Sequence, residues 1–169
     1  MHRDNAKTPI TARSARVSVR GARAFVVPTD AVAVALGELD RTLPAAHFRA
    51  RPTDGADGVR RFYRRGSMVG DMLIGGTGLS MFASRIGPLS ALGVVVVWVG
   101  AQGDGTARVI VSLVRGSEVG ADYVDAVEDA VRALATRGIP LVDEGWSRAV
   151  DVDPALPANP ARAAELGLR

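Results

Sequence analysis

The spacing of apolar residues predicts the first elements of the chain. Apolar and polar side chains alternate over residues 16–27, a period-two pattern that predicts a strand closed by Pro28. The next apolar residues recur at the three- and four-residue spacing of a helix face: Val32, Leu36, Leu39 and Leu43. Thr29 or Asp30 is expected to cap this helix, and Pro44 is expected to end it.

The middle of the chain predicts further strands. Residues 46–51 and 59–65 have strand character on either side of a turn rich in Gly, Asp and Pro. The β-branched run at 92–99 leads through an Asp-Gly turn to a second apolar run at 108–115. This arrangement is typical of a β-hairpin.

The clearest helical pattern covers residues 118–137. One face of this helix is apolar: Tyr123, Val124, Val127, Ala130, Val131 and Leu134. Gly138 is expected to end the helix, and Glu128 and Arg132 have the spacing of an ion pair along it. The proline-rich residues after 140 predict loops and a short final helix that begins at Asn159.

The order strand, helix, strands, helix predicts an α+β domain. Hairpin-linked strands without regular βαβ alternation favour an antiparallel β-sheet packed against the long C-terminal helix. We expect a flexible basic arm over residues 1–15, a single α+β domain over 16–140 and a loop-rich C-terminal tail over 141–169.

This order of elements resembles the START-type helix-grip proteins, the polyketide cyclase and lipid-transport-like family. The hairpin VVVVWVGAQGDGTARVIVSLVRG, followed by VGADYVDAVEDAVRALATR, resembles that family most. The resemblance implies a curved sheet that wraps the helix and an apolar ligand held between them. Because one fold serves many functions, the residues themselves have to support this function.

The composition of the chain excludes several kinds of chemical site. Hydrophobic residues make up 47% and charged residues 23% of the 169 residues, as in globular proteins. The absence of cysteine excludes disulfides, zinc–thiolate sites and iron–sulfur clusters. No secretory signal is visible, which predicts a cytoplasmic protein. Residues 1–66 hold 13 Lys and Arg against 6 Asp and Glu, a net charge of +7, whereas residues 67–169 hold 8 against 12, a net charge of −4.

The run RRFYRR concentrates this positive charge. Alternation along a strand places Arg60 and Arg64 on one face and Arg61 and Arg65 on the other. Arginines beside aromatic residues suit contacts with phosphate, nucleic acid or lipid head groups. Alternatively, the charges keep an exposed edge strand soluble.

The segment that follows is almost uncharged. Residues 66–83 carry Asp71 as their single charge, and their methionines suggest a lining for an apolar ligand or a contact with a membrane or a protein partner. Asp71 and several glycines argue against a membrane span. The run IGGTG is similar to the phosphate-binding turn of extended short-chain dehydrogenase-like proteins, but Met81 stands where the third glycine would be.

Conventional catalysis and metal binding have little support. His47 is the one histidine within the expected fold, and no catalytic residue is predicted. Asp143, Glu144, Asp151 and Asp153 could offer oxygens to magnesium, but the proline-rich tail favours solvated carboxylates. No metal or cofactor is therefore predicted.

The sequence favours a non-enzymatic binding domain for a lipid-like or other amphipathic molecule. Its apolar part would contact Met68, Met72, Phe82 and Trp98, and Arg60 with Arg64, or Arg61 with Arg65, would receive its anionic end. Two alternatives stay open. The segment 66–83 could dock on a protein partner, a second copy or the surface of a membrane, or the basic arm and RRFYRR could bind nucleic acid.

Overall fold

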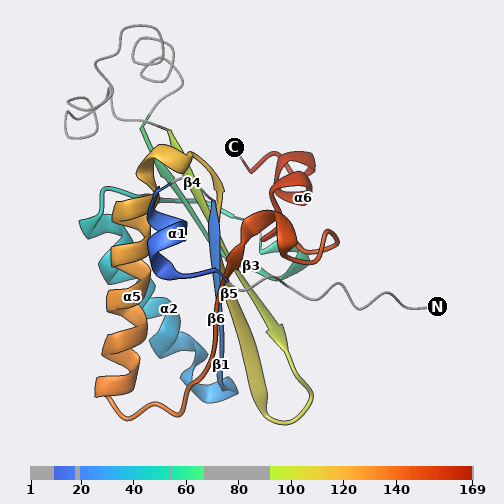
Figure 1. Cartoon of the computed structure of the whole chain (residues 1–169). Helices are drawn as coiled ribbons and strands as arrows, with labels where there is room; N and C mark the ends of the chain where they lie inside the picture. Colours follow the sequence, from blue (N-terminus) through green and yellow to red (C-terminus); the bar gives the residue numbers. More distant parts are fainter. Residues whose placement is uncertain (1–9, 18–19, 54, 67–91, 169) are drawn as a thin grey trace, which may run out of the picture.

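The computed structural model describes residues 10–17, 20–53, 55–66 and 92–168 of the chain. Six antiparallel strands form one sheet in the order β2-β3-β4-β5-β1-β6 (Figure 1). Their bounds are Gly21–Pro28 (β1), Arg49–Arg51 (β2), Val59–Arg65 (β3), Gly93–Ala101 (β4), Thr106–Arg115 (β5) and Val142–Arg148 (β6). The α+β class with an antiparallel sheet is confirmed.

Helices cover one face of the sheet, and the end of the chain covers part of the other. The α-helices are Ala12–Val17 (α1), Val32–Ala45 (α2), Gly120–Thr136 (α5) and Pro160–Glu165 (α6). Short 3-10 turns lie at Thr29–Ala31 (η1), Ala56–Gly58 (η2), Ser117–Val119 (η4) and Ala149–Asp151 (η5). Figure 1 shows α1, α2 and α5 on one side of the sheet and α6 on the opposite side.

Alternation along β4 explains why its valines are buried on both faces. Val95 and Val97 pack with α2 and α5 in the main core. Val94 and Val96 point the other way and share a smaller cluster with Ala163 of α6. A strand covered on both faces has no polar positions to alternate with, so its sequence is a continuous apolar run.

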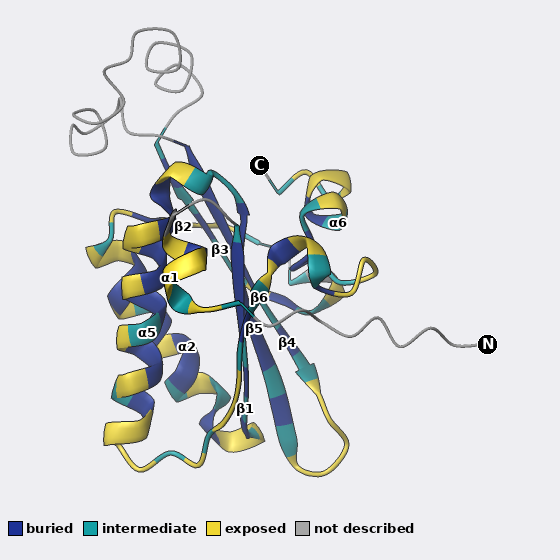
Figure 2. Cartoon of the chain, in the orientation of Figure 1, coloured by how far each residue is buried: buried dark blue, intermediate teal, exposed yellow. Residues whose placement is uncertain are grey.

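Both predicted helix faces are confirmed. Leu36, Leu39 and Leu43 of α2 are buried, and Val32 is partly buried against the same core. Every residue of the predicted α5 face is buried. Figure 2 shows buried residues on the sides of these helices that face the sheet and exposed residues on their outer sides. The predicted cap of α2 is wrong, because η1 precedes the helix and the Thr29 hydroxyl donates to the Gly105 carbonyl at 2.9 Å.

The elements at the ends of the chain differ from the prediction. The long helix α5 is not the last element, since β6 and α6 follow it. The strand β6 was not predicted because only Trp146 of its seven residues is buried. The helix α1 occupies residues expected in the arm and at the start of the first strand. Asn159 caps α6 as predicted, and its side chain accepts a hydrogen bond from the Ala161 N–H at 2.9 Å.

Two local features fix the ends of strands. Gly116 turns the chain from β5 into η4 with a φ of 88°, and a Cβ there would collide with the Leu92 carbonyl oxygen. At the edge of the sheet, Ile10 forms an isolated antiparallel bridge to Trp146 of β6, and its N–H donates to the Trp146 carbonyl at 3.1 Å.

Candidate anion-binding surface

The strand that carries RRFYRR lies inside the sheet. β3 pairs with β2 on one side and β4 on the other, so the prediction of an edge strand is wrong for β3. The edge is the three-residue strand β2. Arg49 and Arg51 of β2 are the cross-strand partners of Arg64 and Phe62.

The face of β3 toward the helices is held by carboxylates. The Arg61 Nε donates to both oxygens of Asp40 at 3.0 and 2.9 Å, and the Tyr63 hydroxyl donates to the same carboxylate at 2.5 Å. Burial, together with the Asp40 carboxylate, raises the pKa of Tyr63 above its ordinary range. Asp40 of α2 therefore occupies Arg61 and keeps the Tyr63 hydroxyl protonated.

Arg65 on the same face is buried. Its guanidinium forms an ion pair with Asp122 of α5, donates to the Ala46 carbonyl at 3.3 Å and lies 5.9 Å from the ring centroid of Phe48. These contacts tie the end of β3 to α5 and to the end of α2. Arg61 and Arg65 therefore stabilise the fold, and their charges are already balanced.

The opposite face of β3 is different. Phe62 on that face packs against the same cluster as Ala163 of α6, so Arg64, two residues along, lies on the face away from α2 and α5. The arginine surface, as we name it, consists of Arg49 and Arg51 of β2 and Arg64 of β3, together with Arg60, which is exposed at a β-bulge between Val59 and Arg61. Within the described segments none of the four has an ion pair, and Arg49, Arg51 and Arg60 are exposed.

Arg64 is the arginine of this surface whose charge is least compensated by the described residues. Its cross-strand partner is Arg49, and such pairs hold their Cβ atoms about 5 Å apart, where like charges destabilise a sheet. Its Nε is buried and has no hydrogen-bond partner among the described residues. A bound phosphate could accept from both guanidinium groups and relieve this repulsion.

The positive charge continues across the sheet. Arg64 is paired with Val94, and Val94 is paired in turn with Arg115 of β5. Arg20 lies next to Arg115, since its Nη1 donates to the Val114 carbonyl at 2.9 Å. Neither Arg20 nor Arg115 has an ion pair within the part of the chain that the structure describes. Arginines therefore occur from β2 to β5 at one end of the sheet.

Of the apolar residues predicted for the site, the structure describes only Trp98. Trp98 is half-buried in a cluster with Ile110, and its Nε1 donates to the Asp57 carbonyl at 2.9 Å. Met68, Met72 and Phe82 lie outside the described residues, as does the run IGGTG. The predicted apolar site therefore stays a prediction.

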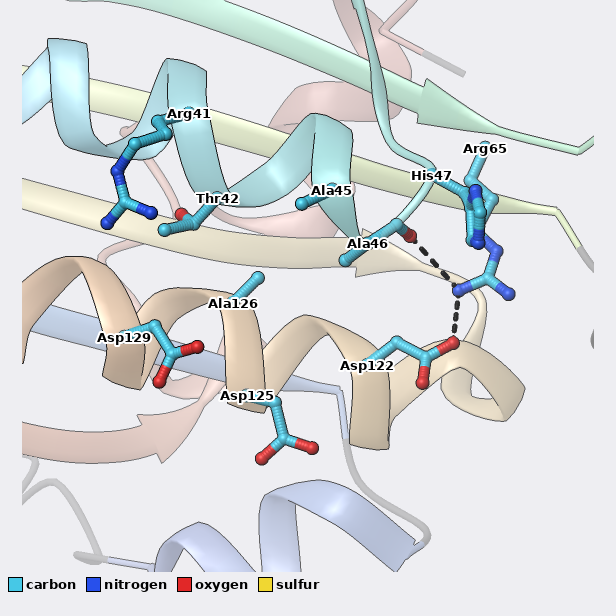
Figure 3. A pocket seen from close by; sticks show the side chains of 10 residues that line it. All are labelled: Arg41, Thr42, Ala45, Ala46, His47, Arg65, Asp122, Asp125, Ala126 and Asp129. Atoms are coloured by element: carbon cyan, nitrogen blue, oxygen red, sulfur yellow. Dashed lines mark hydrogen bonds and ion pairs between the residues drawn. The ribbon is translucent and has the colours of Figure 1, made fainter.

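The sequence also did not predict a pocket on the face of the sheet that the helices cover. It lies between α2, α5 and the end of β3 and has a volume of about 680 Å³ (Figure 3). Arg65 lines it together with His47, which follows α2 with a φ of 68°. No sequence signal marked this pocket, because its walls come from three separate parts of the chain.

Three of the four carboxylates considered for magnesium have ion-pair partners. Asp143 pairs with Arg23 at 2.6 Å, Glu144 with Arg108 at 2.5 Å and Asp151 with Arg148 at 2.6 Å. Residues 10–17, 20–53, 55–66 and 92–168 contain no group of three or more His, Asp or Glu arranged to hold a metal ion.

The described helices and the comparisons with known proteins each add one finding on function. Within the described segments, no helix is both long enough and apolar enough to cross a bilayer. The chain matches no protein-family model, no curated protein and no solved structure. Any functional conclusion therefore depends on the geometry of the molecule.

Proposed function

We propose that the protein binds nucleic acid through the sugar–phosphate backbone, and that the arginine surface makes this contact. The observation that supports this proposal is the set of four arginines on two adjacent strands without carboxylate partners among the described residues. Arginine guanidinium groups bind phosphate oxygens in a bidentate manner. Contacts of this kind position a protein on nucleic acid without reading its sequence.

The extent of the positive charge favours nucleic acid over a lipid head group. Arg20 and Arg115 continue the arginines of β2 and β3 across β4 to β5. A polyanion can contact such an extended surface through several phosphates, whereas a single head group contacts only one or two arginines.

The salt dependence of binding tests this proposal. Fluorescence anisotropy of labelled single- and double-stranded oligonucleotides, over about 50 to 200 mM salt, should show affinity that falls steeply with salt. The Arg49→Ser/Arg64→Ser variant removes two phosphate contacts. We expect the slope of log K against log salt to become shallower by about 1.8 for duplex and about 1.4 for single strands.

A charge-matched control separates a specific surface from general attraction. Arg132→Ser and Arg148→Ser remove exposed arginines that have their own carboxylate partners, at α5 and at the end of β6. Their double variant has the same net charge as Arg49→Ser/Arg64→Ser and should keep the wild-type slope. Equal slopes for both double variants, or binding to anionic vesicles but not to oligonucleotides, would overturn the proposal.

A lipid-like ligand, as the helix-grip resemblance implies, is a separate proposal. Among the described residues, the space between sheet and helices holds buried side chains such as Leu39, Val97 and Val127. The methionine lining predicted for the ligand lies outside those residues. Lipid extraction and mass spectrometry of the purified protein test this proposal, and light scattering tests docking to a second copy.

A further inference from the structure

An aromatic residue lies in the middle of the arginine surface. Phe62 stands between Arg60 and Arg64 along β3, and its cross-strand partner on β2 is Arg51. Residues directly opposite each other in a sheet hold their Cβ atoms about 5 Å apart, so Arg51 lies beside the ring. Phe62 packs against the cluster that contains Ala163, but it stays partly exposed. Its ring therefore combines an accessible aromatic surface with positive charge close by.

Trp98 is the second aromatic residue on this face of the sheet. Phe62 is paired with Val96 of β4, and Trp98 follows Val96 by two residues, so alternation places all three side chains on one face. Cβ atoms in the diagonal relation of Phe62 and Trp98 are about 7–8 Å apart. A Cβ on Gly100 would collide with the six-membered ring of Trp98, so this ring lies directly on the backbone. The part of the indole that stays exposed therefore points away from the sheet.

The same face is too wide and too uneven to enter the groove of a duplex. Six strands at a spacing of about 4.8 Å are about 24 Å wide, whereas the major groove of B-DNA is about 12 Å wide. The helix α6 stands out from this face (Figure 1), and its Ala163 packs with Val94 and Val96 beside β3. A helix adds about 10 Å of height, which keeps a rigid duplex from lying flat on the sheet. Unpaired bases on a flexible strand can reach Phe62 and Trp98, whereas paired bases cannot.

We propose that the arginine surface binds single-stranded nucleic acid in preference to duplex, with unpaired bases stacked on Phe62 and Trp98. The arginines would hold the phosphates of the same strand, so this assignment rests on the proposed function. Aromatic side chains beside a positively charged surface are typical of proteins that bind single strands, since every base has an aromatic face. Arg51 can add to the stacking through its planar guanidinium group.

Fluorescence anisotropy with a single strand and a duplex of the same length tests this preference. The full chain should bind the single strand about tenfold more tightly, because stacking adds to the phosphate contacts. Phe62→Leu keeps an apolar side chain in the cluster but removes the aromatic face, so it should weaken single-strand binding about fivefold or more. Its affinity for duplex and its salt slope should not change. Phe62→Tyr keeps the ring and should bind as the wild type does.

A base stacked on Trp98 also gives a signal in tryptophan fluorescence. The chain has two tryptophans, and Trp146 is only 5% exposed, so a stacked base should quench Trp98. A single strand should therefore lower the emission of the wild type, and Trp98→Leu should lose this quenching.

The possible outcomes separate stacking from the phosphate contacts. Equal affinity for single strand and duplex, or equal single-strand affinity of Phe62→Leu and Phe62→Tyr, would overturn the stacking of bases. The proposed function would still stand in that case if Arg49→Ser/Arg64→Ser had a shallower salt slope than its charge-matched control. Absence of binding to both forms of nucleic acid would overturn both proposals.

Discussion

The two faces of β3 carry the same residue type in opposite electrostatic settings. Arg61 and Arg65 meet Asp40 and Asp122, which α2 and α5 bring to the covered face. Arg60 and Arg64, one residue before each, have no ion pair among the described residues. Whether an arginine of this strand supports the fold or is available to a partner therefore depends on which element packs over it.

The helix α6 lies on the face of the sheet away from α2 and α5, which we call the open face, and it does not balance the charge of the arginine surface. On α6, Glu165 pairs with Arg162 at 3.0 Å, and Arg162 also pairs with Asp57 at 3.2 Å. The carboxylates of Asp57 and Glu165 are therefore already paired with Arg162 of α6. Four experiments can break or sharpen the contrast between the two faces of β3, and they follow from the largest expected effect to the smallest.

Alkaline pH should weaken the helix-covered face most. Tyr63 and Tyr123 are the only tyrosines in the chain, both are fully buried, and burial raises the pKa of each hydroxyl. The unfolded chain loses these protons near pH 10 while the native state keeps them, so stability is present below pH 10 and is lost above it. We expect a loss of about 3 kcal/mol between pH 9 and pH 11.

Absorbance of tyrosinate near 295 nm and circular dichroism measure this effect together. The tyrosinate signal should appear only as the protein unfolds. A signal that rises near pH 10 in protein with native circular dichroism would show that the hydroxyls are accessible, which contradicts the covered face described above.

Substitution of Arg65 should cost more than substitution of its neighbour. Arg65→Met removes the ion pair with Asp122 and the bond to the Ala46 carbonyl. Because Asp122 is half exposed, we expect a loss of about 2 kcal/mol rather than the larger cost of breaking a fully buried pair. Urea denaturation measures this, with Arg64→Met as the matched control, which should change stability by less than about 0.5 kcal/mol. Equal losses for both variants would remove the contrast.

Tyr63→Phe should have an intermediate effect. The substitution deletes the hydroxyl that donates to Asp40 at 2.5 Å and leaves the packing of the ring unchanged. Asp40 keeps its ion pair with Arg61, so we expect a loss of about 1 kcal/mol in urea denaturation. A stability equal to that of the wild type would mean that Arg61 alone satisfies the Asp40 carboxylate.

Replacement of Arg64 on the open face should have the smallest effect. It should raise the stability, because it relieves repulsion between two arginines. Arg64→Gln removes the like-charge pair with Arg49 and should raise stability by a few tenths of a kcal/mol, about the worth of a cross-strand pair. Added phosphate should raise Tm of the wild type more than that of Arg64→Gln. The same Tm increase in both proteins would argue against an anion site at this pair.

Local periodicity predicted the elements that bury one face. The leucine stripe of α2 and the apolar face of α5 follow from residues close in sequence, and the Asp-Gly turn correctly joins β4 to β5. β6 was missed because it is held at the sheet edge mainly by its backbone and by one buried residue, Trp146. Such a strand has no apolar alternation to detect.

The choice of ion-pair partners could not be predicted, because it depends on tertiary structure. Glu128 does not pair with Arg132 along α5, since its carboxylate accepts from the Trp146 Nε1 at 2.5 Å and pairs with Arg23 at 3.3 Å. Likewise, the alternation of RRFYRR correctly separated Arg64 from Arg61 and Arg65, whereas a β-bulge interrupts it at Arg60. Only the positions of Asp40 and Asp122 showed which face was neutralised.

The bridge between Ile10 and Trp146 has a consequence for aggregation. An unpaired sheet edge can add a strand from another molecule, and this sheet has two edges, β2 and β6. Ile10 occupies the backbone of β6 at Trp146, and β2 is only three residues long and carries Arg49 and Arg51. Ile10 therefore covers one position of the β6 edge, and removal of residues 1–10 should make concentrated protein more prone to form intermolecular β-structure.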